Sequence, residues 1–321
     1  MNEQPIFNRL ALIGVGLIGS SIAHAARKQG AVRSIVATAR SAATRRRVAE
    51  LGLADQVVET NAAAAEGADL VIVCVPVGAC GEVAAEIGPH LSAGAVVSDV
   101  GSVKGTVLRD MAPHIPAGVH FVPAHPVAGT ENSGPDSGFA ELFVNRWCIL
   151  TPPPHADAAA VSKLAAFWTL LGANVETMLA EHHDLVLGIT SHLPHLIAYT
   201  IVGTAEELSQ VTRSEVLQFS AGGFRDFTRI AASDPTMWRD VFLANKDAVL
   251  EMLGRFNEDL STLTRAIRRG DGDTLFNHFT RTRAIRRGIV NIGQDSPVPD
   301  FGRPHPDLPH QPLPRPYAAE D

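Results

Sequence analysis

A short glycine-rich segment near the N-terminus, GVGLIG from Gly14 to Gly19, constrains the fold more than any other feature of this chain. It follows an apolar run typical of a buried strand and precedes LIGSSIAHAARKQG, whose helical pattern stops at Gly30. The spacing G-x-G-x-x-G between a strand and a helix is typical of dinucleotide-binding folds, where the backbone approaches a pyrophosphate at the helix N-terminus. Glycines that serve only a tight turn are the alternative. We predict that five residues of this segment bind a cofactor: Gly14, Gly16, Leu17, Ile18 and Gly19.

Alternating strand and helix patterns continue through the first half of the chain. The runs SIVATA, ADLVIVCVPV, AVVSDVGS, HFVPAH, RWCILTPP and NVETML are predicted strands, and helical stretches separate most of them. Strands that alternate with helices predict a parallel sheet with helices on its faces. We therefore expect an α/β domain, a doubly wound parallel sheet of the Rossmann type, over residues 1–180.

After about Glu181 no strand pattern is convincing, and an all-helical dimerisation domain is expected over residues 181–292. Its clearest element begins at Pro235, and apolar residues recur at helical spacing as far as Ile267. Such a long helix usually packs along other helices, which predicts a helical bundle and a dimer interface. A long helix that packs only within its own chain is the alternative.

Composition restricts the partners. The 321 residues carry a formal net charge of −7, which argues against nucleic acid because phosphate binding needs a basic surface. The three cysteines form no C-x-x-C pair, the N-terminus lacks the basic region of a signal peptide, and no apolar run is expected to reach membrane-spanning length. We expect a soluble cytoplasmic protein that binds a small molecule, with a disordered proline-rich tail over residues 293–321.

The end of the second predicted strand bears on the choice of nicotinamide cofactor. NAD-binding folds usually place a carboxylate there to hold the ribose 2′-hydroxyl, but the segment ATARSAAT has none. Arg40 and Ser41 could contact a 2′-phosphate instead, which favours NADP or the use of both NAD and NADP. An Arg40 side chain in solvent, with no cofactor role, is the alternative.

Two prolines frame a histidine in FVPAHPVAG, where His125 lies between Pro123 and Pro126. Proline fixes its own φ and restricts the preceding residue, so this backbone is unusually determined for a loop. The segment follows a predicted strand, at the carboxyl edge where doubly wound sheets bind ligands. We expect His125 to act as a general base, because imidazole accepts a proton near neutral pH; a structural hydrogen bond is the alternative.

Ser102, in the segment GSVKG, follows another predicted strand and is expected at the same edge of the sheet. Its hydroxyl could fix the tautomer of the imidazole, as second groups do in catalytic pairs. Equally, it could cap the helix that begins near Val103.

The segment EHHDLVLGITSHLPHLIAY contains four histidines: His182, His183, His192 and His195. Clustered histidines can ligate zinc, but no H-E-x-x-H motif or cysteine accompanies them. His183 and His192 are also half a turn out of phase on a straight helix, and Pro194 complicates a continuous one. We therefore predict no metal, and expect His195, and also His192, to hydrogen-bond a substrate.

The segment SAGGFRDFTRIA places Asp226 and Arg229 three residues apart, so they are neighbours on one face if this segment is helical. They could form an ion pair within the helix. The alternative is that Arg229 binds a substrate carboxylate, because the planar guanidinium group recognises carboxylates well.

Several of these segments together resemble the prephenate and arogenate dehydrogenase family over roughly residues 8–290: ALIGVGLIGSS, DVGSVK, PAHPVAGTENSGPDSGFAELF, EHHDLVLGITSHLPHLIAY and SAGGFRDFTRIAASDPTMW. The resemblance implies a homodimer that oxidatively decarboxylates prephenate or arogenate with hydride transfer to NAD or NADP, in tyrosine biosynthesis. It implies that His125 is the catalytic base and that Ser102 supports it. It also implies a substrate pocket formed by residues of the second half: His195, Arg229, Asp226 and Gly222. The chain departs from many relatives where the second predicted strand ends, since the acidic residue is missing there.

Three other functions fit parts of this pattern. Another Rossmann-type hydroxy-acid dehydrogenase would rely on a lysine in the helical half, where Lys246 has no supporting motif. A regulator that senses a nicotinamide cofactor without turnover would not need His125, His195 and Arg229 together. A zinc enzyme built on the histidine cluster is the third, and metal analysis of the purified protein would test it.

Overall fold

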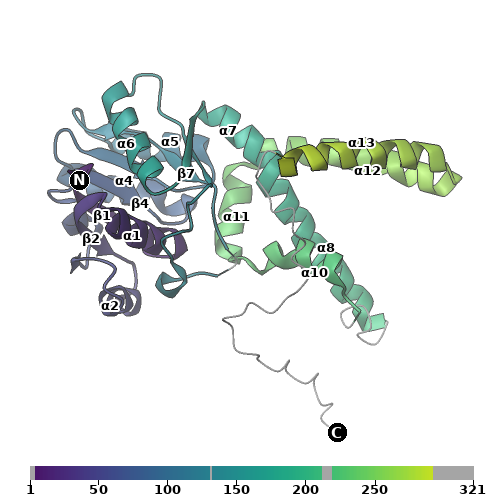
Figure 1. The fold of residues 1–321 in the computed structure, drawn as a ribbon, viewed down its shortest axis with the longest axis horizontal. Coiled ribbons are helices and arrows are strands. Elements are labelled where there is room, and N and C mark those ends of the chain that lie inside the picture. The colour runs from purple at the N-terminus through teal and green to yellow at the C-terminus, as the bar shows by residue number, and fades with distance from the viewer. Residues whose placement is uncertain (1–3, 131, 212–218, 292–321) are drawn as a thin grey trace, which may run out of the picture. The chain divides into compact units, whose positions relative to one another are not determined.

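The computed structural model describes residues 4–130, 132–211 and 219–291, and Figure 1 shows the course of the chain. Contacts between residues divide the chain into two units, each of which is described by itself. The first consists of Met1–Ala205 and Thr228–Arg255, and the second of Glu206–Phe227 and Phe256–Asp321. The predicted tail, residues 293–321, lies outside the described residues.

A six-stranded parallel sheet lies at the centre of the first unit, in the order β3-β2-β1-β4-β5-β6. Its strands are β1 (Phe7–Ile13), β2 (Val32–Thr38), β3 (Gln56–Val57), β4 (Leu70–Val73), β5 (Val96–Asp99) and β6 (His120–Phe121). The strand order reverses between β1 and β4, so ligands are expected beyond the carboxyl ends of these two strands. This arrangement confirms the predicted Rossmann-type fold.

Helices cover both faces of this sheet (Figure 1). They are α1 (Leu17–Gln29), α2 (Ala42–Glu50), α3 (Asn61–Ala65), α4 (Cys80–Ile87), α5 (Lys104–Met111) and α6 (Ala158–Leu170), with short turns η1 (Val77–Ala79), η2 (Gly88–His90), η3 (Ala112–His114) and η4 (Pro135–Ser137). Successive residues of β1 point to opposite faces: Leu10 and Leu12 pack in one apolar cluster with α1 and α6, and Ala11 and Ile13 in another with α4 and α5. The first helix ends at Gly30, as predicted, with a left-handed φ of 64° at this residue.

The end of the predicted strand HFVPAH and the last two predicted strands do not extend the parallel sheet. They form a second sheet of β7 (Ala124–Pro126), β8 (Trp147–Leu150) and β9 (Asn174–Thr177), in which β7 is antiparallel to β8 and β9 is parallel to it. The predicted strand HFVPAH is therefore wrong as one element, since β6 ends at Phe121. Pro123 has no amide hydrogen to donate to a ladder, and the chain changes sheets at this point.

A continuous helical run follows the second sheet and consists of α7 (Ala180–Leu187), the π-turn η5 (Gly188–His192) and α8 (Leu193–Val211). The π-turn holds more residues per turn than an α-helix and so shifts the phase of the residues that follow. As a result His183 and His192 are both fully buried, although a straight helix would separate them by half a turn. Pro194 lies at the start of α8, where its missing amide hydrogen does not interrupt the run.

The part of this run from Ala180 to Leu208 is long and apolar enough, by length and composition alone, to cross a membrane, with a mean hydropathy of 1.5. The expectation that no apolar stretch reaches this length was wrong. The run also carries His183, Asp184 and His192, which are buried and hydrogen-bonded to other parts of the first unit. These three residues pack the first part of the run against the first unit, whereas 28% of its apolar window is buried.

The long helix predicted from Pro235 is two helices, α11 (Pro235–Ala244) and α12 (Lys246–Arg269). The side chain of Asp234 caps α11 by accepting a hydrogen bond from the amide of Met237, 2.9 Å away. Asn245 separates the helices with φ of −109° and ψ of 31°. The apolar spacing continues through Asn245, so periodicity did not reveal the break.

The remaining elements are also helical, as predicted: α10 (Gly222–Thr228), the 3₁₀ turn η6 (Arg229–Ala232) and α13 (Gly272–Asn291). The chain turns between α12 and α13 at Gly270, which has a left-handed φ of 66°. In the second unit several large apolar side chains of α12 and α13 are exposed: Leu260, Ile267, Phe276, Phe279 and Ile285.

Candidate active site

The glycine loop fits a dinucleotide. Gly14 has φ of 88°, and a Cβ at this position would lie 2.8 Å from the carbonyl oxygen of Cys74, so only glycine is accommodated. A Cβ at Gly19 would lie 2.5 Å from the carbonyl oxygen of Gly14, so this glycine allows α1 to pack closely on the loop. A Cβ at Gly16 would meet no atom within 4 Å, and no side chain caps α1 there. The free amides of the first turn, which contains Leu17 and Ile18, therefore suit a pyrophosphate.

The end of β2 contains no carboxylate, in agreement with the sequence. The hydroxyl of Ser41 caps α2 by accepting a hydrogen bond from the amide of Thr44, 3.0 Å away. The Arg40 side chain is exposed, and its carbonyl accepts a hydrogen bond from the guanidinium of Arg45, 3.2 Å away. Ser41 thus has a structural task, and Arg40 is the residue whose side chain is available to a ribose phosphate.

His125 lies in β7, and its ring contacts the ring of His183. Nδ1 of His125 is 2.8 Å from Nε2 of His183, and Nδ1 of His183 is 2.8 Å from Oδ1 of Asp184. The three residues are almost completely buried, with exposed fractions of 8%, 0% and 9%. The hydroxyl of Ser102, expected to hold the imidazole, makes no hydrogen bond to it in the described part of the chain. The role of Ser102 stays a prediction.

The carboxylate of Asp184 is held by the N-terminus of α5. It accepts hydrogen bonds from the amides of Lys104 and Gly105, at 2.7 and 2.8 Å. The N-cap residue of α5 is Val103, which has no side-chain hydrogen bond to offer, so Asp184 replaces a local cap. The alternative role of Ser102 as the helix cap is therefore wrong.

A buried ion pair fixes the backbone next to His125. Lys104 donates through Nζ to the carboxylate of Asp99 and to the carbonyl oxygen of Ala124, the latter at 2.8 Å. Both charged side chains are fully buried. Burial raises the pKa of the Asp99 carboxyl, whereas the Lys104 ammonium and the amides of Gly101 and Ala124 oppose this shift. The pair ties β5, α5 and β7 together.

The electrostatic surroundings keep His125 neutral. Burial is the main cause that lowers its pKa well below the usual 6.5, and the nearby His183, Lys104 and His192 act in the same direction. Burial also lowers the pKa of His183, although Asp184 opposes the shift. A neutral imidazole at physiological pH can accept a proton, as a general base must.

His192 is buried beside the break between α11 and α12. Its Nδ1 lies 3.0 Å from the amide nitrogen of Asn245, which also donates to the carbonyl oxygen of Asp184 at 2.8 Å. Burial lowers the pKa of His192 to about 4. Because the amide nitrogen can only donate, Nδ1 accepts and Nε2 carries the hydrogen. That Nε2 makes no hydrogen bond of ordinary geometry among the described residues, and an interaction with the backbone of Ser102 opposes the fall in the pKa of His192.

His195 stacks on Trp238 of α11, with ring centroids 3.6 Å apart and an interplanar angle of 24°. Its Nδ1 donates to the carbonyl oxygen of Ser191, 2.8 Å away, which leaves Nε2 as an acceptor. Burial lowers the pKa of His195, and the positive charge of Arg229 acts in the same direction. His195 and Arg229 therefore interact within the first unit.

The other predicted substrate residues lie in the second unit. Gly222 begins α10, and the carboxylate of Asp226 lies 3.6 Å from the guanidinium of Arg225. Their part in substrate binding stays a prediction. The fourth histidine of the cluster, His182, is exposed. No group of three potential metal ligands occurs in residues 4–130, 132–211 and 219–291.

Sequence reasoning missed six residues of this region: Asp99, Lys104, His183, Asp184, Trp238 and Asn245. The adjacent pair His183-Asp184 in EHHD was the one available signal, because a carboxylate next to a histidine often orients an imidazole. A buried lysine in GSVKG could not be recognised, since lysines are rarely buried.

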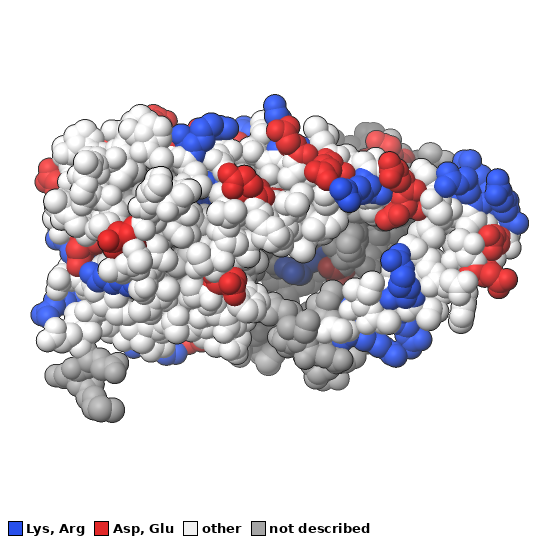
Figure 2. Space-filling model, turned by 90° about the horizontal axis from the view of Figure 1, so that it is seen from above, with Lys and Arg blue, Asp and Glu red and all other residues white. Residues whose placement is uncertain are grey.

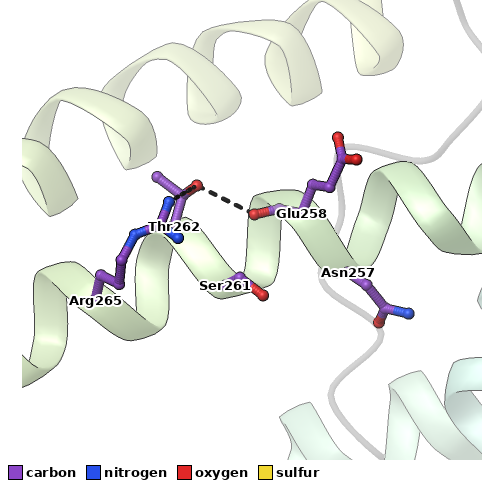
Figure 3. A pocket seen from close by; sticks show the side chains of 5 residues that line it. All are labelled: Asn257, Glu258, Ser261, Thr262 and Arg265. Atoms are coloured by element: carbon purple, nitrogen blue, oxygen red, sulfur yellow. Dashed lines mark hydrogen bonds between the residues drawn. The ribbon is translucent and has the colours of Figure 1, made fainter.

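Two further surface features do not form a site. A hollow of about 310 Å³ on α12 is lined by Asn257, Glu258, Ser261, Thr262 and Arg265 (Figure 3). All five come from one helix, and the bond from the Thr262 hydroxyl to the Glu258 carbonyl lies within that helix. On the face shown in Figure 2, basic and acidic side chains are interspersed, without a continuous basic surface.

Both halves of the chain match models of one protein family. The model of the prephenate dehydrogenase nucleotide-binding domain matches residues 22–177, and that of the prephenate dehydrogenase dimerization domain matches residues 179–281. Together the two models span most of the chain, including His125 and the histidine cluster; the first match begins within α1, after the glycine loop.

Individual relatives agree with these matches. The chain is 43% identical to a cyclohexadienyl dehydrogenase of Zymomonas mobilis over 284 residues, which cover 88% of this chain and 97% of the relative. It is 32% identical to a prephenate dehydrogenase of Bacillus subtilis, over 97% of this chain and 83% of that one. A crystal structure of prephenate dehydrogenase from A. aeolicus, in complex with hydroxyphenyl propionate and NAD⁺, superposes with a TM-score of 0.82 at 33% identity. The superposition covers 90% of this chain and 99% of that one.

Proposed function

This chain belongs to the prephenate dehydrogenase family, and we propose that it oxidatively decarboxylates prephenate, arogenate or both, with His125 as the general base. The chain is thus an NAD(P)-dependent oxidoreductase of tyrosine biosynthesis. The observation that carries the role of His125 is its buried ring, hydrogen-bonded through Nδ1 at 2.8 Å and kept neutral by its surroundings. Its other nitrogen, Nε2, is the one that can meet a substrate.

The chemistry divides between cofactor and chain. The glycine loop Gly14–Gly19 and the first turn of α1 would hold the pyrophosphate of a nicotinamide dinucleotide, which supplies the hydride acceptor when bound. Nε2 of His125 takes the proton of the ring hydroxyl while the hydrogen on the same carbon leaves as hydride. The ring carboxylate departs as CO₂, and its bonding electrons make the ring aromatic. His125 then returns the proton to the phenolate oxygen, which yields 4-hydroxyphenylpyruvate from prephenate, or tyrosine from arogenate.

Substrate binding is assigned to His195 and Arg229. Nε2 of His195 is free to accept a hydrogen bond because Nδ1 is committed to Ser191. Stacking on Trp238 holds the imidazole plane. The Arg229 guanidinium, close enough to lower the pKa of His195, suits the carboxylate of the substrate side chain.

The cofactor preference and the assembly are the finer parts of this proposal. An exposed Arg40 at the end of β2, with no carboxylate nearby in that segment, supports the use of NADP as well as NAD. The dimerization-domain match and the exposed apolar side chains of α12 and α13 support a homodimer. We further propose that the enzyme acts in the cytoplasm.

The test is the formation of reduced nicotinamide by the purified protein with prephenate, with NAD and NADP compared side by side, and then with arogenate. Wild-type protein should turn over at least one of the two substrates. His125→Asn should lower kcat by roughly 10²–10⁴-fold. The variant should still bind the substrate, as measured by a change in protein fluorescence. If the wild type prefers NADP and Arg40→Ala removes this preference, Arg40 is the residue that binds the 2′-phosphate. No turnover of either substrate by the wild type would reject the function, and near-normal turnover by His125→Asn would reject the base.

A further inference from the structure

The proton on Nδ1 of His125 has an acceptor that is itself fixed by a carboxylate. Nδ1 of His125 lies 2.8 Å from Nε2 of His183, whose Nδ1 lies 2.8 Å from Oδ1 of Asp184. The two histidines are separated by 58 residues in the chain and come from β7 and α7. Since both are buried, no water competes for these ring nitrogens from an open surface.

The carboxylate of Asp184 determines which atom donates in each of these hydrogen bonds. Both carboxylate oxygens of Asp184 already accept hydrogen bonds, from the amides of Lys104 and Gly105. An ionised carboxylate can only accept, so Nδ1 of His183 donates to it. Nε2 of a neutral His183 then has a lone pair and accepts from Nδ1–H of His125. The free lone pair of His125 is therefore on Nε2.

We propose that His183 and Asp184 are positioning residues that set the tautomer of His125 and so keep Nε2 unprotonated for the substrate. This inference rests on the proposed role of His125 as general base. An imidazole without a partner on Nδ1 prefers the Nε2–H tautomer, which cannot accept a proton at that atom. The contact to His183 reverses this preference. When His125 becomes protonated during the reaction, the same contact, backed by Asp184, stabilises the imidazolium ion.

The surroundings hold these residues in place from three sides. Asp184 is anchored to the N-terminus of α5, and its backbone carbonyl oxygen accepts from Asn245 at 2.8 Å. Lys104 ties the carbonyl of Ala124, the residue before His125, to the same helix. Rotation of either imidazole would therefore break these hydrogen bonds.

The first test reads the tautomer directly. Two-bond ¹H–¹⁵N correlation spectra of protein labelled with ¹⁵N-histidine distinguish the two tautomers, and His125→Asn assigns the signals. Wild-type protein at neutral pH should show His125 protonated on Nδ1. A wild-type spectrum with the proton on Nε2 would overturn the proposal whatever the activity of the enzyme. This readout does not use turnover, so it separates a failure of the inference from a failure of the proposed function.

The second test compares His183→Leu with His183→Gln. Leucine offers no acceptor, so His125 should change to the Nε2–H tautomer and kcat should fall by about 10²-fold or more, with KM little changed. Glutamine can accept from His125 and donate to Asp184, and it should restore both the tautomer and kcat to within about tenfold of the wild type. The matched control is His182→Gln, which changes the exposed neighbour on the same helix and should leave both measurements unchanged.

Asp184→Asn provides the third test. An amide that donates to Nδ1 of His183 would place the hydrogen of His183 on Nε2, which then donates to His125 and forces the wrong tautomer. We expect a loss of kcat comparable to that of His183→Leu, together with changed tautomers of both histidines. Variants of His183 or Asp184 that fold, as judged by thermal unfolding, and yet retain wild-type kcat would reject the positioning role.

Discussion

At the scale of single residues, the two prolines that frame His125 constrain its backbone, and hydrogen bonds constrain its ring. Proline at 123 ends one strand pairing, so that the chain enters the second sheet with His125 opposite Ile149. The ring then meets His183 instead of solvent. A catalytic base gains from both constraints, because a small misplacement of a reacting group costs much of the advantage of proximity.

Arg229 offers a prediction at this scale. Its guanidinium acts on His195 electrostatically and is proposed to bind the carboxylate of the substrate side chain. Arg229→Ala should therefore raise KM for prephenate by roughly 10- to 100-fold, which corresponds to the loss of one charge-assisted contact of about 1.5–3 kcal/mol, with a smaller effect on kcat. Steady-state kinetics would measure both constants. The exposed Arg225→Ala, which removes the contact to Asp226, is the control. An unchanged KM for Arg229→Ala would leave this residue a structural role.

The site residues that could be identified from the sequence are constrained by their neighbours in the chain, whereas those that were missed make contacts with residues far along the chain. His125 was recognisable because its constraint is local, in the prolines on either side. His183 and Asp184 act across 58 and 80 residues of chain, on His125 and Lys104 respectively, and no local pattern carries that information. The phase argument that separated His183 from His192 assumed a straight α-helix, and the π-turn between them removed its basis.

At the scale of elements, helix irregularities bring the polar groups together. The π-turn η5 and the break at Asn245 lie in different segments, yet both act on His192. The π-turn rotates the His192 side chain inward, and Asn245 donates a hydrogen bond to it. The alternation of strands and helices predicted the parallel sheet correctly, because a period of two or of 3.6 is a property of each element alone. The change of sheet at Pro123 and the break at Asn245 depend on partners far along the chain, so periodicity could not show them.

Asn245→Ala tests the helix break. Alanine would favour a continuous helix from α11 into α12, but it would leave Nδ1 of His192 buried without its donor. It would also remove one of the two donors to the carbonyl oxygen of Asp184, which keeps the amide of Gly188. We expect the free energy of unfolding to fall by about 2–4 kcal/mol, and kcat/KM to fall because the backbone of Asp184 is less well held.

Urea unfolding and steady-state kinetics measure the two effects of Asn245→Ala. The matched control is Asn257→Ala, an exposed asparagine on α12, the helix that follows Asn245, for which a change within about 0.5 kcal/mol is expected. If Asn245→Ala were as stable and active as the wild type, the break would be a passive consequence of packing.

At the scale of the whole molecule, the second unit presents apolar side chains that one chain does not cover. Phe276 and Phe279 of α13 are 70% and 55% exposed, and Leu260 and Ile267 of α12 are 49% and 66% exposed. Exposed apolar patches of this kind mark protein interfaces, and the matched family model describes a dimerization domain. A second copy of this chain is therefore the partner that we expect on α12 and α13.

The double variant Phe276→Glu/Phe279→Glu tests this assembly. Each fully buried phenylalanine contributes about 1.5–3 kcal/mol and is counted twice in a two-fold symmetric dimer, so Kd should rise by at least about 100-fold. Sedimentation velocity over a range of concentrations should show a dimer for the wild type and a monomer for the variant at low micromolar protein. Asn277→Glu, which adds a charge between the two positions without removing apolar surface, should leave the dimer in place. A wild type that sediments as a monomer would reject the homodimer, and a double variant that remains dimeric would move the interface to another surface, such as the exposed apolar residues Ile201 and Leu208 of α8.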